Sequence, residues 1–114
     1  MMNLREINWF VAEKVMNWHV WENEDGELMV TKGYGCYSHC PSFSTNIADA
    51  WQVVEKLNGD DFDFQVWREK GKYNVEFAKD FFYLFGFAES ENAALAICLA
   101  ALKAVGVEEE VTEQ

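Results

Sequence analysis

Apolar residues repeat at intervals of three and four in three stretches of the chain, which predicts three amphipathic helices. The first stretch opens with Asn3 and carries Glu6 three positions later, the pattern of a capping box. The second opens with Asn46, which can cap the first helical turn at Asp49. The predicted helices cover residues 3–18, 46–57 and 90–105, with Asn58-Gly59 and Gly106 as stops of the second and third and Glu89 as an alternative start of the third.

Alternating apolar and polar residues predict two hairpins and one further strand. Residues 19–31 can form two short strands around an Asn-Glu-Asp-Gly turn. Residues 62–77 alternate on both sides of a second turn, Glu69-Lys70-Gly71. Phe81 to Phe87 is almost wholly apolar, so we expect it to be a strand that is covered on both faces.

The remaining segment, residues 32–43, contains two glycines and the only proline, so we expect an ordered loop. The resulting order of elements is α-ββ-α-βββ-α. It predicts an α+β domain in which an antiparallel sheet of about five strands is sandwiched between helices. We expect residues 1–106 to form this single domain and residues 107–114 to form an acidic tail that frays.

The chain has a large acidic excess, with a formal net charge of −11 over 114 residues. Proteins that track along DNA or RNA use Lys and Arg to displace counterions from the phosphates, so we expect no nucleic acid polymer as a partner. No run of 18 apolar residues is present, and we expect no membrane partner. No secretory signal precedes the first helix, so we expect a reducing cytosol.

Cys36, His39 and Cys40 are residue types that bind zinc, but they offer too few ligands. Only the distant Cys98 or His19 could complete the set, and Cys98 lies in a helical pattern that predicts a buried thiol. A Cys–His nucleophile pair would need an orienting partner and a pocket. Since the chain also lacks a glycine-rich nucleotide loop and a GxSxG motif, we expect free thiols, no metal, no cofactor and no enzymatic activity.

Aromatic residues make up 16% of the chain, more than one core of this size requires. They can line a surface or fill the core, and the sequence leaves both open. A pocket near the third helix could stack a ring on Phe82, read its edge with Asn92 and hold a phosphate with Arg68 and the helix start. Alternatively, Arg68 pairs with a neighbouring Glu and Asn92 only caps the helix. The candidate ligand-binding residues are Arg68, Phe82, Ser90, Asn92 and Lys103, of which Asn92 and Lys103 share one helical face.

Three stretches of the chain carry a family resemblance. They read INWFVAEKVMNW at residues 7–18, FSTNIADAWQVVEKL at residues 43–57 and ALAICLAALKAVG at residues 94–106. Together they resemble the phage ABA sandwich family. The resemblance covers nearly the whole chain and implies a small phage or prophage protein with a sheet between helix layers, located in the cytoplasm of the bacterial host.

Small phage sponges that disarm Thoeris defence are similar in size and layout. This similarity implies a homo-oligomer that sequesters a cyclic ADP-ribose signal, and we carry it onto Arg68, Phe82 and Asn92. The family often has a proline and an arginine where this chain has Ala94 and Leu99, which removes one possible phosphate contact. The predicted function is a non-enzymatic phage protein that binds a cyclic nucleotide and counters bacterial defence. The alternative is an acidic interaction module that inhibits a host or phage protein by occupying a basic site.

Overall fold

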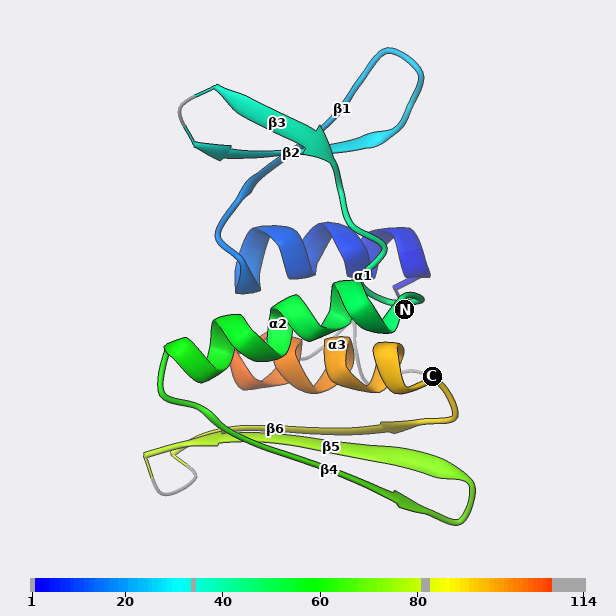
Figure 1. Cartoon of the computed structure of the whole chain (residues 1–114), viewed down its shortest axis with the longest axis vertical. Coiled ribbons are helices and arrows are strands. Elements are labelled where there is room, and N and C mark those ends of the chain that lie inside the picture. The colour runs from blue at the N-terminus through cyan, green and yellow to red at the C-terminus, as the bar shows by residue number, and fades with distance from the viewer. Residues whose placement is uncertain (1, 34, 81–82, 108–114) are drawn as a thin grey trace.

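Two three-stranded antiparallel sheets lie at opposite ends of the molecule, with helices between them (Figure 1). The computed structural model describes residues 2–33, 35–80 and 83–107. In these residues the elements are α1 (Leu4–Phe10), its π-helical continuation η1 (Val11–Val15), β1 (His19–Glu22), β2 (Leu28–Gly33), β3 (Cys36–His39), α2 (Ile47–Gly59), β4 (Asp63–Glu69), β5 (Lys72–Lys79), β6 (Leu84–Ser90) and α3 (Ala93–Ala104). The strand orders are β1-β2-β3 in the first sheet and β4-β5-β6 in the second.

The fold class is α+β, as predicted, but the single sheet of about five strands is wrong. The two predicted hairpins belong to different sheets, because β2 pairs with β1 and β3, whereas β5 pairs with β4 and β6. The layers are also reversed, since the helices lie between sheets (Figure 1). Hydrophobic periodicity indicates which side of a strand faces a core, and it does not specify which strands pair.

The segment predicted as an ordered loop contains a further strand, β3. Residues Cys36–His39 pair with β2, with a register shift between Thr31 and Gly33. The chain turns at Gly33 and Gly35, whose φ angles of +118° and +77° suit glycine. All four residues of β3 are exposed, so the strand has no buried side. The sequence therefore carries no apolar alternation that could have predicted it.

The apolar stretch predicted as a strand covered on both faces contributes an edge strand instead. Its described part is β6, which begins at Leu84, and residues 81 and 82 lie outside the described residues. Helix α3 packs against β6, yet Phe85 remains 44% exposed. The central strand of this sheet is β5, in which Val75 and Phe77 are fully buried.

The predicted starts of the first two helices are confirmed, whereas the third helix begins at Ala93 after its cap Asn92, later than the predicted start at Glu89 or Ser90. The Asn3 side chain accepts a hydrogen bond from the Glu6 backbone, and the Glu6 side chain accepts one from the Asn3 backbone, which completes the capping box. Asn46 caps α2 by accepting a hydrogen bond from the backbone of the first turn. The left-handed residue after α2 is Asp61, with a φ of +72°, and not Gly59 as predicted.

Helix α3 lies at the centre of the core (Figure 1). It packs against β5 and β6 on one side and against α1, η1 and α2 on the other. Its buried residues are mostly alanines: Ala94, Ala96, Ile97, Cys98, Ala100, Ala101, Leu102 and Ala104. Burial raises the pKa of the Cys98 thiol, which confirms the predicted buried thiol. Within the described residues, no helix combines the length and apolarity needed to cross a membrane.

The second sheet and α3 approach each other closely at Gly86 of β6. A β-carbon at this position would lie 2.0 Å from the Ala100 backbone oxygen and 2.5 Å from the Ala104 backbone nitrogen. These distances are far shorter than van der Waals contact, and backbone atoms cannot rotate away as a side chain can. Glycine is therefore required at position 86 if α3 is to lie on the sheet.

We expect Gly86→Ala to lower the free energy of unfolding by at least about 2 kcal/mol, because the added methyl group must push α3 away from β6. Urea unfolding followed by circular dichroism measures the loss. Gly59→Ala is the matched control, since no atom lies within 4 Å of a β-carbon there and its φ is not left-handed. We expect that control to be neutral or to gain up to about 1 kcal/mol. Equal stability of Gly86→Ala and the unchanged protein would contradict the close contact.

Candidate functional site

Three of the predicted ligand residues gather at one end of the second sheet. Arg68 on β4 and Ser90 on β6 are the direct cross-strand neighbours of Tyr73 on β5. Directly opposed residues of antiparallel strands point to the same face of a sheet. Asn92 follows two residues after Ser90, at the start of α3. The fold thus brings Arg68, Ser90 and Asn92 to the same end of the sheet.

Each of these three side chains has a partner within the fold. The Asn92 side chain accepts a hydrogen bond from the Leu95 backbone at 3.2 Å, so it caps α3. The Ser90 hydroxyl accepts one from the Asn92 backbone at 3.1 Å. The Arg68 guanidinium lies over the Tyr73 ring, 5.3 Å from its centroid. The capping alternative for Asn92 is confirmed, and in the described residues Arg68 stacks on a ring rather than pairing with a Glu.

Lys103 lies far from this cluster. It follows Asn92 by eleven residues along α3, which corresponds to about 16 Å along the helix axis. Ala96, on the helical face between them, is fully buried. The described residues therefore do not form one continuous pocket along this face. Phe82, the predicted stacking platform, lies outside the described residues.

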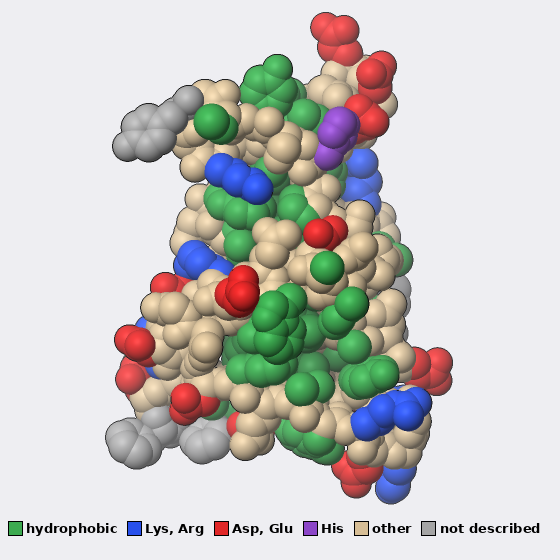
Figure 2. Space-filling model, viewed as in Figure 1, with side chains coloured by type: hydrophobic (Ala, Val, Ile, Leu, Met, Phe, Trp, Pro, Cys, Tyr) green, Lys and Arg blue, Asp and Glu red, His purple; other side chains and the backbone are tan. Residues whose placement is uncertain are grey.

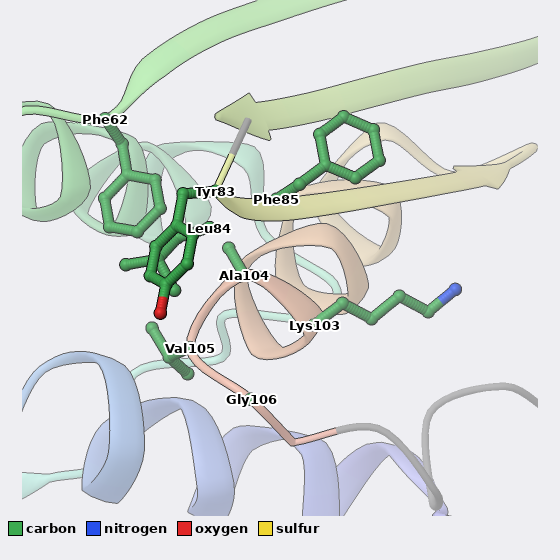
Figure 3. A pocket seen from close by; sticks show the side chains of 8 residues that line it. All are labelled: Phe62, Tyr83, Leu84, Phe85, Lys103, Ala104, Val105 and Gly106. Carbon is green, nitrogen blue, oxygen red and sulfur yellow. The ribbon is translucent and has the colours of Figure 1, made fainter. Parts of the chain in front are cut away.

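A hollow of about 420 Å³ lies at the end of α3 where Lys103 is found (Figure 3). Its lining residues are Phe62, Tyr83, Leu84, Phe85, Lys103, Ala104, Val105 and Gly106. The Tyr83 side chain is 83% exposed, whereas Phe62 is buried. Figure 3 shows the Lys103 chain extending away from the Tyr83 ring. We call this space the α3-end hollow, and its surface is mainly apolar and aromatic.

Three segments far apart in the sequence meet at the α3-end hollow. The α2–β4 connection supplies Phe62, whose backbone N–H donates to the Leu57 carbonyl at 3.0 Å. The start of β6 supplies Tyr83, whose N–H donates to the Asp80 carbonyl at 3.1 Å. Helix α3 ends at Gly106, as predicted, with a φ of +95°. Local hydrogen bonds therefore fix the three segments that carry the lining residues.

Lysine side chains give the α3-end hollow a positive rim. The Lys103 ammonium donates to the Phe87 carbonyl at 3.2 Å, along the edge of β6. The Lys79 ammonium lies over the Phe62 ring, 5.3 Å from its centroid. Lys103 also offsets the negative end of the α3 dipole, because it stands in the last turn. The arrangement suits a flat ring whose anionic group reaches toward the lysines.

Sequence analysis missed Phe62, Tyr83 and Lys79 as site residues. Tyr83 belongs to the aromatic stretch 81–87, and the excess of rings there over the needs of an edge strand was a usable signal. No signal in the sequence joins Phe62 to that stretch. Their proximity depends on how α2, β6 and α3 pack, which is a property of the tertiary structure.

A second hollow, of about 400 Å³, has His39 and Cys40 among its lining residues. His39 Nε2 lies 3.3 Å from Glu27 Oε1, and a hydrogen bond from Asn23 together with His39 lowers the pKa of Glu27. Burial, with a smaller contribution from the Asp49 charge, raises the pKa of Cys40 to about 11. His39 therefore contacts a carboxylate rather than activating Cys40. No three His, Cys, Asp or Glu side chains of the described residues could hold a metal ion together.

We expect the three free cysteines to react with iodoacetamide in the order Cys36, Cys40 and Cys98. Cys36 is exposed, and Cys98 is fully buried. With its pKa at about 11, Cys40 is ionised in roughly one molecule in a thousand at pH 8, and the thiolate is the reactive form. Peptide mass spectrometry of the native protein measures the order, with modification in urea as the control. Modification of Cys40 as fast as Cys36 at pH 8 would contradict the raised pKa.

Comparisons with known proteins agree with this fold. The sequence matches the phage ABA sandwich domain family over residues 9–102. The structure is similar to the 2.0 Å crystal structure of a phage protein from Bacillus cereus ATCC 14579, with 31% sequence identity and a TM-score of 0.71. That match covers 91% of this chain and 93% of the other. A comparison with curated proteins gave no match. Because the family match spans most of the chain and overlaps all three stretches that resemble it, this chain belongs to the phage ABA sandwich domain family.

Proposed function

We propose that this phage-family protein is a non-enzymatic binder that captures a cyclic nucleotide of the cyclic ADP-ribose type and so withholds an immune signal of the bacterial host. The α3-end hollow carries the proposal. There the Tyr83 ring is 83% exposed beside a hollow that is lined by further rings and by Lys103. An exposed ring loses its contact with water when a flat ligand covers it, which favours binding.

The chemistry of the α3-end hollow supports a ligand made of a base and phosphates. Tyr83 supplies exposed aromatic surface, and stacking on a ring contributes about 1–3 kcal/mol per base. Lys103 lines the hollow and Lys79 rests on the Phe62 ring, so both bring positive charge near the hollow, which favours an anionic group on the ligand. The volume of about 420 Å³ lies in the range of pockets that hold small ligands.

Capture of a signal requires affinity and slow release, and it does not require a group that lowers a reaction barrier. Such a protein works by stoichiometric binding, so its effect depends on how much of it is present relative to the signal. A surface of rings and lysines without a nucleophile is sufficient for this role. The captured molecule leaves unchanged, which distinguishes the proposal from a hydrolase.

A second candidate function rests on the acidic tip of the first hairpin, which Figure 2 shows at one end of the molecule. Glu24 and Asp25 at this tip are exposed and stand near Glu22 and Glu27. Arg5 binds Glu22 and His39 binds Glu27, which leaves Glu24 and Asp25 to present negative charge. This surface favours an interaction module that occupies a basic site on another protein.

We expect one member of a panel of cyclic ADP-ribose isomers and cyclic dinucleotides to raise the melting temperature of the protein. A ligand at a hundred times its dissociation constant adds about 2.7 kcal/mol to the free energy of unfolding. Tyr83→Ala should weaken binding by about tenfold to a hundredfold, because it removes a stacking ring. Thermal melting and calorimetry measure both effects, and native mass spectrometry after expression with an active Thoeris system should detect the cargo.

Tyr37→Ala is the matched control, because Tyr37 is 66% exposed on β3 and does not line the α3-end hollow. It should bind as the unchanged protein does. No shift with any member of the panel would contradict capture of such a signal, and an unchanged affinity of Tyr83→Ala would contradict this site. Salt-sensitive binding to a basic protein, lost in Glu24→Gln/Asp25→Asn, would instead favour the interaction module.

A further inference from the structure

Strand β4 has a long open edge. Its seven residues pair with β5 in unbroken register, and six of them are exposed. On its other side, β4 pairs with no strand of the described residues. Soluble proteins usually guard such an edge with a lysine, a proline, a bulge or a very short strand. Strand β4 contains no lysine, proline or bulge, and its charged residues stand at its ends, Asp63 at the start and Arg68 and Glu69 at the finish, so its middle is unprotected. On the opposite edge, β6, the Lys103 ammonium covers the Phe87 carbonyl.

An apolar surface lies beside this open edge. We define the α2–β4 patch as Ile47 and Trp51 of α2 with Phe64 and Val66 of β4. Trp51 contacts Phe64 edge to face at 5.7 Å, and Trp51 and Val66 are 46% and 47% exposed. Helix α3 packs on β5 and β6, so β4 is covered mainly by its narrow contact with α2. Figure 2 shows hydrophobic side chains gathered over α2 and the adjoining sheet.

Opposite charges stand at the two ends of the α2–β4 patch. Helix α2 and strand β4 run in opposite directions, because a connection of only three residues joins them (Figure 1). Glu55 therefore lies on one side of the Trp51–Phe64 contact and Arg68 on the other. Both are exposed, and in the described part of the chain neither forms an ion pair. A twofold rotation about the middle of the patch would bring Arg68 of one copy to Glu55 of the other.

We propose that the β4 edge and the α2–β4 patch form a twofold interface with a second copy of this chain. The two β4 strands would pair antiparallel and join the second sheets of both copies into one six-stranded sheet. A second copy is the occupant that fits, because a twofold interface uses the same surface on both sides and this surface has opposite charges at its two ends. Backbone pairing supplies the open N–H and C=O groups with partners, and the patches cover each other.

This interface goes beyond the proposed capture function and does not depend on it. The α2–β4 patch and the α3-end hollow have no residue in common. The hollow is lined mainly from the start of β6 and the end of α3, and Phe62, directly before β4, is its one residue from the α2–β4 connection. Loss of the dimer and loss of ligand binding are therefore separate outcomes that separate measurements can report.

Sedimentation equilibrium of the full chain tests the interface, and we expect a monomer–dimer equilibrium. Val66→Lys should raise the dimer dissociation constant at least about tenfold. The variant places a lysine of each copy inside the interface, where the two like charges lose water and repel each other. Leu4→Lys is the matched control, since Leu4 is 45% exposed on α1 and lies outside the patch. It should dimerise as the unchanged protein does. Circular dichroism verifies that both variants are folded.

A charge exchange tests the orientation of the two copies. Arg68→Glu and Glu55→Arg should each weaken the dimer, and the double variant should restore it, because the opposite charges then face each other again. Hydrogen exchange of the β4 amides should slow as protein concentration rises. A monomer at every concentration, a folded Val66→Lys variant that dimerises unchanged, or a double variant that stays as weak as the single ones would overturn the proposal.

Discussion

The spacing of the layers in this molecule depends on the contact between Gly86 and the backbone of α3. Because position 86 has no side chain, the helix can lie directly on β6, with the Ala100 and Ala104 backbone against the strand. The small side chains of α3 make favourable van der Waals contacts only at this short distance, because an alanine reaches few atoms across a wider gap. The same small side chains let α2 and η1 approach α3 from the other side. A helix that is apolar all round must be enclosed in this way.

The lateral position of α3 then determines which surfaces stay open. The helix covers β5 and β6, so the inner side of β4 has only its narrow contact with α2. Large apolar residues that would fill a core under a wider helix layer are therefore half exposed at this edge, as Trp51 and Val66 show. At the opposite edge, the end of α3 stops beside the start of β6 and leaves the α3-end hollow. Both candidate surfaces follow from one packing arrangement.

Local signals in the sequence predicted local structure well. The capping box of Asn3 and Glu6 is present, and the hairpin turn at Lys70-Gly71 has the left-handed φ angles of +55° and +80° that such a turn needs. These features depend on a few neighbouring residues. The sheet arrangement was wrong because it depends on contacts between distant segments. Strand β3 carries no buried residue, and the apolar pattern of β6 is equally compatible with a central or an edge strand.

Only part of the candidate site could be predicted, again because a local pattern is compatible with more than one role. Side-chain oxygens at a helix start can cap the helix or bind a ligand, and the sequence pattern is the same for both. Here Asn92 and Ser90 already accept backbone hydrogen bonds, so a ligand that took these oxygens would have to displace the N–H groups of Leu95 and Asn92. The Tyr83 ring at the other end of α3 is 83% exposed. A flat ligand on that ring would cover surface that the fold leaves in contact with water, so the free energy of stacking adds to binding.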